Sequence, residues 1–396
     1  MRIFYAADNS ADPRLGIQSN IWRNNLYLTL VDAGHDVVEF DYDLTETVQK
    51  ADKLRNKRFI SRNRPRITNE LLRQLKEAHA DRPIDLFFSY FYDCCVLPEG
   101  IDAIRALDIT TVNWYCNGSY QFDLVEEISP HYDWCLVPEA FRLKDYESIG
   151  ARPIYCQEAA NPNIYQPYDV PVEFDVTFVG QAYGERPNYI KYLSENGVSV
   201  KVWGYGWEKF SDTHRSRAKN PIWRLSRKLK EFMMDTYWQD GFRRLLALEL
   251  FRSGSRIFHE KPAVTLPDEI IGGVLSDSDM IPTYSRSKIN LGFSSCGEIG
   301  ETEERIVQIR LRDFEVPMSG GFYMVEYMEE LEEFFDIGKE IVCYSDPEDL
   351  VGKIKYYLEH DNQREEIRRA GHKRALRNHT WHQRFEMAFR QMGMGA

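Results

Sequence analysis

The chain has 396 residues, of which 43% are hydrophobic and 28% charged, and its formal net charge is -12. This length is too great for one ordinary hydrophobic core and predicts two domains of roughly 150–200 residues each. The acidic balance excludes a general nucleic-acid-binding surface. No apolar run approaches the roughly 18–20 residues of a membrane span, and the seven cysteines show no metal-ligand spacing. We therefore expect a cytoplasmic protein with reduced, buried thiols.

The first 160 residues alternate between apolar runs and amphipathic stretches. We expect helices at 20–33, 67–80 and 101–107, and strands at 2–7, 35–42, 85–91, 110–115, 132–137 and 152–156. The charged stretch 45–66 is expected to be a solvated helix and a loop. Such alternation predicts an α/β domain with a parallel, doubly wound sheet. The first turn lacks the G-x-G-x-x-G pattern, which weakens a dinucleotide-binding interpretation.

A second alternation follows a segment that is rich in turn-forming residues. We place a linker at 161–172, between an N-terminal domain at 1–160 and a C-terminal domain at 173–378. The second domain begins with expected strands at 175–180 and 198–204 and an expected helix at 188–196. Helices are also expected at 348–360, 362–378 and 381–392.

Residues 211–261 interrupt this alternation with basic residues interleaved among aromatic ones. Ten arginines and lysines lie between positions 215 and 252, beside Trp223, Tyr237 and Trp238. A helical insertion of this kind can lie against an anionic membrane or hold an acceptor. Packing against the body of the protein or against another subunit is equally compatible with the pattern.

The stretches 284–293 and 308–323 carry the strongest indication of chemistry. The first is expected to be a helix end followed by a buried strand, and the second a helix that stops at Gly320-Gly321. Arg312 and Glu315 lie one turn apart on that helix. A guanidinium suits phosphate oxygens, a carboxylate suits ribose hydroxyls, and glycines allow close approach to backbone amides. The alternative is an ordinary surface ion pair followed by a simple helix stop.

These stretches, in their order and spacing, resemble the glycosyltransferases related to the CgeB spore-maturation proteins, within the "glycosyl transferases group 1" set. The likeness rests on Lys288–Leu291, Gln308–Tyr323, Tyr344–Leu350, Phe178-Val179-Gly180 with Arg186, Trp203–Trp207, and His379-Thr380-Trp381 with Arg384. It covers most of the C-terminal half and, more loosely, the N-terminal half. The resemblance implies the GT-B fold, which has two Rossmann-like domains, a cleft between them, and a final helix, here 379–396, that crosses back to the N-terminal domain.

The resemblance also implies a donor site on the C-terminal domain. Arg312, with Arg186 or Lys288, is expected to neutralise the diphosphate of a nucleotide sugar, most commonly a UDP-sugar, without a metal ion. Glu315 is expected to bind the ribose, and Gly180, Gly320 and Gly321 to approach the phosphates or the sugar. Since its carboxylate would then be free of core contacts, Glu315→Ala should weaken nucleotide binding with little loss of stability. No Asp-x-Asp motif stands at an expected strand end in this region.

The acceptor side is expected in loops of the N-terminal domain, at Asp8–Ser19, Tyr115–Asp123 and His131. Asp123 and His131 are the candidate bases for an inverting mechanism. Many retaining relatives carry two glutamates separated by seven residues, but Val307 stands where the first would precede Glu315. A retaining outcome is therefore favoured by analogy alone.

The predicted activity is metal-independent transfer of a sugar to a glycan, protein, lipid-linked or other cell-surface acceptor. Two alternatives remain open at this point. A nucleotide-sugar epimerase on the same fold would use one nucleotide sugar and no acceptor. A non-catalytic nucleotide-sugar or carbohydrate-binding protein would keep Arg312 and Glu315 without an acceptor site.

Overall fold

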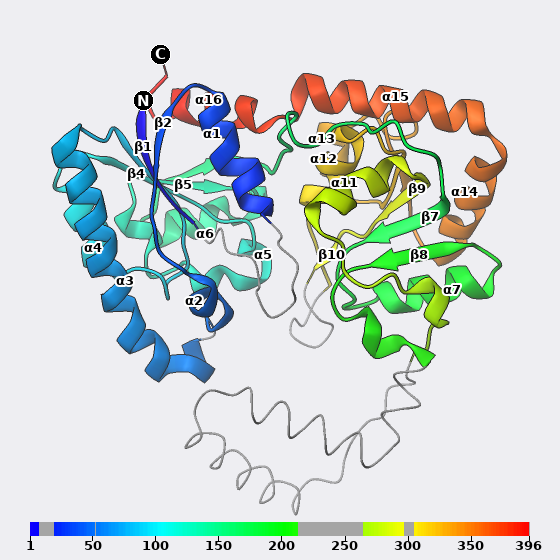
Figure 1. Cartoon of the computed structure of the whole chain (residues 1–396), viewed down its shortest axis with the longest axis horizontal. Helices are drawn as coiled ribbons and strands as arrows, with labels where there is room; N and C mark the ends of the chain where they lie inside the picture. The colour runs from blue at the N-terminus through cyan, green and yellow to red at the C-terminus, as the bar shows by residue number, and fades with distance from the viewer. Residues whose placement is uncertain (8–19, 52, 213–263, 297–304, 396) are drawn as a thin grey trace, which may run out of the picture.

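The computed structural model describes residues 1–7, 20–51, 53–212, 264–296 and 305–395 (Figure 1). In these ranges the strands form two parallel sheets, one in each half of the chain, and one short antiparallel pair. The predicted α/β class with two Rossmann-like domains is therefore confirmed. Nearly all of the predicted insertion 211–261 and the whole of the predicted acceptor loop 8–19 lie outside the described residues.

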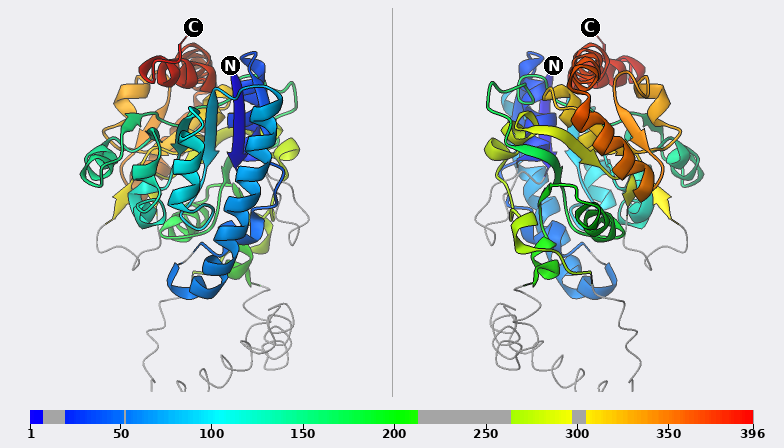
Figure 2. Two further views of the ribbon diagram at one scale, coloured as in Figure 1. Left: turned by 90° about the vertical axis from the view of Figure 1, so that its left-hand side faces the viewer. Right: turned by 90° about the vertical axis from the view of Figure 1, so that its right-hand side faces the viewer.

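The N-terminal sheet has the strand order β2-β1-β3-β4-β5-β6. Its strands are β1 (Arg2–Ala7), β2 (Asp36–Glu39), β3 (Leu86–Tyr90), β4 (Thr110–Trp114), β5 (Trp134–Val137) and β6 (Pro153–Tyr155). The central strands are buried along their whole length because helices cover both faces, as in other parallel sheets. Figures 1 and 2 show α3 (Lys53–Asp81) and α4 (Pro98–Arg105) on the side that faces away from the other domain.

The other helical segments of this domain are short. They are the π-helical turn η1 (Arg23–Tyr27), α1 (Leu28–Asp32), α2 (Thr45–Gln49), α5 (Gly118–Gln121), α6 (Leu143–Ser148) and the 3₁₀ turns η2 (Phe122–Leu124), η3 (Ser129–His131) and η4 (Ala140–Arg142). The helix predicted at 67–80 begins earlier than expected and includes Pro65. Its first half is held in place because the Arg64 guanidinium donates to the carbonyl oxygen of Val96 (2.6 Å) and pairs with Glu127 (2.9 Å).

The C-terminal sheet has the strand order β13-β12-β9-β7-β8. Its strands are β7 (Phe174–Val179), β8 (Val200–Trp203), β9 (Ser287–Gly292), β12 (Tyr323–Glu326) and β13 (Val342–Tyr344), and the antiparallel pair is β10 (Ser295–Cys296) with β11 (Ile306–Val307). The helical segments described here are α7 (Arg186–Glu195), η5 (Trp207–Phe210), η6 (Asp268–Ile270), α11 (Asp277–Ser285), α12 (Leu311–Met318), α13 (Leu331–Phe334), α14 (Pro347–Glu359) and α15 (Asp361–Asn378).

Both parallel sheets share one topology. In each, the first strand lies between the second and the third, so that the connections on its two sides run to opposite faces of the sheet. This makes a topological switch point between β1 and β3 and another between β7 and β9. Open α/β sheets bind ligands in the crevice beyond the carboxyl ends of their strands at such a point.

The last helix, α16 (Trp381–Gln391), returns to the N-terminal domain as predicted (Figure 1). Its buried residues Trp381, Phe385 and Phe389 belong to the N-terminal hydrophobic core. The Trp381 ring meets Trp114 of β4 edge to face, with the ring centroids 5.2 Å apart. A Thr380–Gln383 capping box starts this helix, where the Thr380 hydroxyl accepts from the Gln383 amide.

The seven cysteines are all buried and free, which agrees with the prediction that they are packing residues. Among the described helices, none combines the length and the apolar character needed to cross a bilayer.

Candidate active site

Three arginines gather at the switch point of the C-terminal sheet. Arg186 is the first residue of α7, which follows β7, and Arg310 and Arg312 lie just before and at the start of α12. The Arg186 guanidinium lies near the rings of Phe178 and Phe293, which end β7 and follow β9. These are the strand ends at which the fold predicts a ligand.

Arg186 is a buried cation whose charge is not neutralised by a protein carboxylate. Its side chain is only 6% exposed, donates to the carbonyl oxygen of Gln181 (3.0 Å), and lies over the ring of Tyr183 at 3.8 Å. Within the described ranges no ion pair involves it. Burial is the main reason that the pKa of Arg186 is lowered to about 10; Tyr183 opposes this shift and repulsion from Arg310 adds to it. An unpaired buried charge is costly, so this arrangement favours binding of an anion.

Arg310 lies beside Arg186 and was missed by the sequence analysis. Its guanidinium donates to the Tyr183 hydroxyl (3.0 Å) and to the carbonyl oxygen of Ser295 (2.9 Å). Its backbone amide donates to Asp313 (2.7 Å), which fixes the start of α12. The available signal was its position two residues before Arg312, next to the expected start of the same helix.

Arg312 and Glu315 form a buried pair, not the surface pair of the alternative interpretation. Glu315 is fully buried and accepts a hydrogen bond from the Arg312 guanidinium, which also donates to the carbonyl oxygen of Val179 at the end of β7 (3.2 Å). The Tyr165 hydroxyl lies beside the same carboxylate, which contributes to the raised pKa of Tyr165. In this conformation Oε2 of Glu315 accepts from Arg312, while its buried Oε1 has no hydrogen-bond partner among the described residues. The burial corrects the expectation of a carboxylate free of core contacts.

The glycines predicted to face phosphate have their amides bonded within the protein. The Gly180 amide donates to the carbonyl oxygen of Trp203 (2.8 Å). The amides of Gly320 and Gly321 donate to the carbonyl oxygens of Pro317 and Val316, both at 2.9 Å, and so end α12. Gly320 and Gly321 also precede β12, at the amino edge of the sheet. The helix-stop interpretation therefore describes Gly320 and Gly321 better than a phosphate-binding role.

Lys288 lies at the opposite edge of the sheet from the arginines. It is the second residue of β9, and its ammonium group pairs with Asp175 near the start of β7 (2.7 Å). Because the arginines occupy the carboxyl edge, this position separates Lys288 from the predicted donor site.

Neither predicted base lines a pocket in the cleft. His131 lies on η3, before β5, where its Nδ1 is 3.0 Å from the carboxylate of Asp102 at a solvent-exposed position. Asp123 is exposed on η2 and interacts with other parts of the protein. His131 therefore does not lie at the carboxyl edge of the N-terminal sheet, and Asp123 lies at the protein surface.

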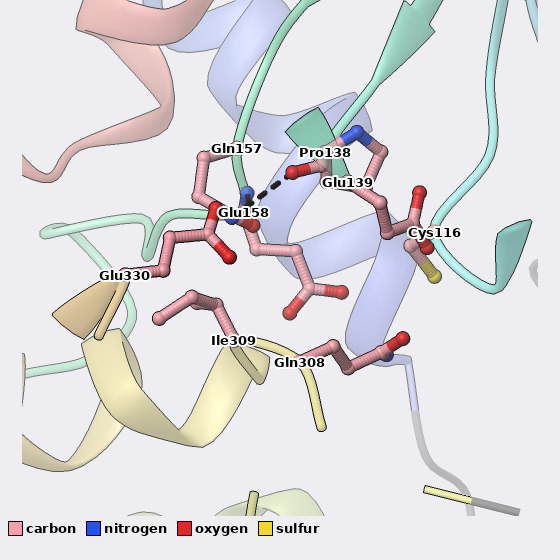
Figure 3. A pocket seen from close by; sticks show the side chains of 8 residues that line it. All are labelled: Cys116, Pro138, Glu139, Gln157, Glu158, Gln308, Ile309 and Glu330. Carbon is pink, nitrogen blue, oxygen red and sulfur yellow. Dashed lines mark hydrogen bonds between the residues drawn. The ribbon is translucent and has the colours of Figure 1, made fainter. Parts of the chain in front are cut away.

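A pocket of about 200 Å³ lies between the two domains (Figure 3). Its N-terminal wall follows the ends of β4, β5 and β6, and its C-terminal wall precedes α12 and α13. The lining residues are Cys116, Pro138, Glu139, Gln157, Glu158, Gln308, Ile309 and Glu330. This volume includes space that is open to solvent, and the residues that line it come from both domains.

Glu139 and Glu158 are the carboxylates that the sequence analysis missed. They follow consecutive parallel strands, β5 and β6, and are 4% and 5% exposed. Burial raises the pKa of Glu139 to about 7 and raises the pKa of Glu158 well above its usual range. The available signal was an acidic residue two or three positions after each of two successive strands.

The two domains contact each other around this pocket through polar groups. Glu330 accepts from the Tyr155 hydroxyl (3.0 Å) and the Gln157 side-chain amide (3.2 Å), and the Ser119 hydroxyl donates to Gln308. In the described part of the chain, no group of three or more histidine, cysteine, aspartate or glutamate side chains is arranged to hold a metal ion.

A family model described as "Glycosyl transferase-like" matches residues 253–390. This range includes β9, β12, α12 and the arginines Arg310 and Arg312. No curated protein matched the sequence.

Solved structures match the whole chain at low sequence identity. A sucrose-phosphate synthase from Thermosynechococcus elongatus superposes with a TM-score of 0.56 at 12% identity, with 99% of each chain covered. Alr3699/HepE from Anabaena, in complex with UDP, gives 0.52 at 10% identity and covers 99% of this chain and 100% of that one. AviGT4, a glycosyltransferase involved in avilamycin A biosynthesis, gives 0.53 at 12% identity and covers 99% and 96%.

These neighbours share the two-domain arrangement, which places the switch-point arginines and the interdomain pocket within a known architecture. The chain has the two-domain GT-B fold of these solved structures, and residues 253–390 are similar to the glycosyl transferase-like family.

Proposed function

We propose that this protein transfers a sugar from a nucleotide-diphosphate donor to a hydroxyl group of an acceptor. The observation that carries the proposal is the pair of arginines at the carboxyl edge of the C-terminal sheet, the buried Arg186 and the half-buried Arg310. Arg186 lies there without a carboxylate partner among the described residues. A diphosphate supplies the negative charge that this position lacks.

A UDP-sugar is the first donor to test. Support comes from Anabaena Alr3699/HepE, which was solved with UDP and, in a second structure with a TM-score of 0.50 at 10% identity, with UDP-glucose. The match to the complex with UDP-glucose covers 99% of both chains.

The arginines have a defined role in the proposed reaction. The bond between the anomeric carbon and the diphosphate oxygen breaks, its electron pair stays on that oxygen, and the acceptor oxygen bonds to the anomeric carbon. Arg186 and Arg310 stabilise the charge that develops on the leaving diphosphate, because fixed cations in a site shielded from water act strongly on such charge. We expect this stabilisation to make a divalent metal unnecessary.

Arg312 stabilises the chain segments that carry the proposed donor site. Its guanidinium holds Glu315 and the end of β7 together, and so fixes the start of α12 against the strand that leads to Arg186. Oε1 of Glu315 is buried without a hydrogen-bond partner among the described residues, so its binding to ribose is a separate proposal from phosphate binding.

A thermal-shift panel of UDP, GDP, ADP, CMP and dTDP, each with and without EDTA, tests the donor site. A ligand that binds only the folded state raises Tm by mass action. We expect UDP to raise Tm equally with and without EDTA. If no nucleotide diphosphate raises Tm, the proposal fails, and a shift abolished by EDTA would contradict metal independence.

Product analysis with the selected nucleotide sugar then separates the possible activities. Transfer to an added acceptor, or release of the diphosphate into water, supports the proposal. Conversion of the sugar to its epimer without release would identify an epimerase. Binding with neither product would identify a non-catalytic protein.

A further inference from the structure

Two glutamates stand opposite the arginines, on the other side of the cleft. Glu139 follows β5 and Glu158 follows β6, and both line the pocket whose far wall is formed by Gln308 and Ile309 (Figure 3). Gln308 lies two residues before Arg310 in the same segment. The pocket therefore joins the N-terminal domain to the chain segment that carries the proposed phosphate ligands.

Both glutamates have an oxygen with no hydrogen-bond partner. The Oε2 atoms of Glu139 and Glu158 are buried and unpartnered, although both side chains are more than nine-tenths buried. Glu139 keeps its orientation because its Oε1 accepts from the backbone amide of Ser119 (3.3 Å). Buried polar atoms are nearly always hydrogen-bonded in folded proteins, so two open acceptor positions in one pocket indicate a ligand with hydroxyl groups.

The two carboxyl groups lie in different surroundings, which shift their pKa values by different amounts. Burial raises the pKa of Glu139, but backbone amides of Ser119 and Gly118 and the charge of Arg142 restrain it near 7. Burial also raises the pKa of Glu158 well above its usual range, and the charges of Glu139, Asp313 and Glu315 raise it further against the effect of Arg310. Glu158 therefore favours its protonated form more than an ordinary glutamate does, while Glu139 is partly ionised near pH 7. Pairs of carboxyl groups separated in this way are typical of acid–base sites.

We propose that Glu139 and Glu158 form the acceptor subsite, in which Glu139 takes the proton of the attacking hydroxyl and Glu158 donates a hydrogen bond to the same acceptor. The inference rests on the proposed glycosyl transfer. As the bond between the acceptor oxygen and the anomeric carbon forms, the O–H bond of the acceptor breaks and its proton moves to Oε2 of Glu139. The diphosphate leaves with the electron pair of the broken glycosyl–phosphate bond, and Glu139 then releases the proton to solvent.

The same carboxyl groups limit which acceptors fit. Glu330 is a third carboxyl group on the pocket wall, so an anionic acceptor would meet repulsion from several directions. We therefore assign a neutral, hydroxyl-bearing acceptor to this subsite. A neutral sugar should react faster than its phosphorylated counterpart.

Several groups besides Glu158 influence the charge of Glu139 and enter any pH argument. They lie after β4, on η4, on α6 and on β10 of the other domain, and they are, in that order, Cys116, Arg142, Tyr146 and Cys296. Burial raises the pKa of each of these cysteine thiols and of Tyr146. Near pH 7 the two thiols and Tyr146 therefore stay neutral, so Glu139 is the group among them that titrates there.

The decisive variant is Glu139→Gln, because the amide keeps the shape and the Ser119 contact but cannot take a proton. The assay measures UDP release from UDP-glucose, with water alone, with methyl glucoside and with glucose 6-phosphate. We expect the wild-type kcat/KM to fall below about pH 7, where Glu139 becomes protonated. Loss of a general base costs about 10²–10⁴-fold. Glu139→Gln should lose activity to this extent and show no such acid limb.

Two further variants control for folding and for charge. Glu147→Gln changes an exposed glutamate of the same domain and should keep the wild-type rate and pH profile. Glu139→Asp keeps the carboxylate but withdraws it from the pocket, so it should retain the acid limb at a reduced rate. The UDP-induced rise in Tm should be equal in all four proteins, since none of these residues is a proposed donor ligand.

The outcomes separate this inference from the proposed function. If wild-type protein neither gains Tm from UDP nor releases it, the glycosyl-transfer proposal fails first. If wild-type protein binds and releases UDP while Glu139→Gln keeps the wild-type rate or the acid limb, Glu139 is not the base. Faster reaction of glucose 6-phosphate than of methyl glucoside would overturn the assignment of a neutral acceptor.

Discussion

The Arg312 guanidinium donates to the carboxylate of Glu315, whose side chain is fully buried one turn later in α12. Removal of one partner of a buried ion pair costs about 3–5 kcal/mol because the other charge loses its partner. Arg312 is 26% exposed and water will partly solvate it. We therefore expect Glu315→Ala to lower the free energy of unfolding by about 3 kcal/mol, measured by urea denaturation, with Glu315→Gln losing less. If Glu315→Ala kept wild-type stability but bound UDP more weakly, the result would instead support the ribose-binding role of Glu315.

Arg186 should behave in the opposite way. Because its buried charge has no carboxylate partner in the described structure, Arg186→Gln should leave Tm of the unliganded protein unchanged or higher. The same variant should weaken UDP binding at least tenfold, about 1.4 kcal/mol, measured by calorimetric titration. Arg390→Gln, which alters an exposed arginine of α16, is the matched control and should bind UDP normally. Normal UDP affinity in Arg186→Gln would remove Arg186 from the donor site.

His379 should make stability depend on pH. Burial among Phe314, Phe334 and Phe335 lowers the pKa of His379 from 6.5 to about 4, and its Nε2–H donates to the carbonyl oxygen of Phe334 (2.8 Å). The folded state therefore binds fewer protons than the unfolded state between these values, so this contribution is complete above about pH 6.5 and is lost as the pH falls toward about 4.

The free energy of unfolding of wild-type protein relative to His379→Gln should fall across that range by up to about 3 kcal/mol. Taking the difference removes the opposite contribution of buried acids such as Asp313, whose pKa is raised to about 6 in both proteins. A difference that does not change with pH would show that His379 titrates normally.

The packing of α16 against the N-terminal core should contribute measurably to the free energy of unfolding. Trp381 is fully buried against Trp114, and Trp→Ala changes in cores cost about 3–5 kcal/mol. Leu376→Ala, at an exposed position of α15, should cost less than about 0.5 kcal/mol. Equal melting temperatures of the two variants would contradict the packing of α16 described above.

Two glycines provide a matched test of backbone constraints. Gly204 has φ +138°, and an added Cβ would lie 2.1 Å from the carbonyl oxygen of Gly180, so Gly204→Ala should be strongly destabilising. Gly352 lies within α14 with open space around its Cα, so Gly352→Ala should stabilise by about 0.5–1 kcal/mol. Thermal denaturation of both variants checks the opposite signs, and a stable Gly204→Ala protein would refute the close approach.

The sequence predicts most of the secondary structure because the buried strands are strong local signals. The apolar runs that became β3, β4, β7 and β9 lie within about two residues of the predicted bounds. Two features were not predictable from the local pattern. The two-residue strands β10 and β11 are too short for any periodicity, and α3 passes through Pro65 because distant contacts with Val96 and Glu127 hold that segment.

The site was predictable only in part, because residue type does not reveal which edge of a sheet a residue occupies. Arg186 and Arg312 reach the carboxyl edge, but Lys288 lies at the amino edge since it enters β9 instead of leaving it. The same reasoning separates Glu139 and Glu158, which follow strands, from His131, which precedes one. The pocket that Glu139 and Glu158 share with Gln308 of the other domain depends on how the two domains assemble. No local motif encodes that arrangement.

The position of α16 has a consequence for how the protein is made. Trp381, Phe385 and Phe389 complete a core whose first strand begins at Arg2. On the ribosome, the residues of the N-terminal domain emerge before those of the C-terminal domain but lack this helix until residues 381–391 have been made. Domains usually fold in the order in which they are translated. Here the C-terminal domain can close before the N-terminal core is complete, so a nascent chain stalled before residue 381 should expose the apolar surface that α16 covers.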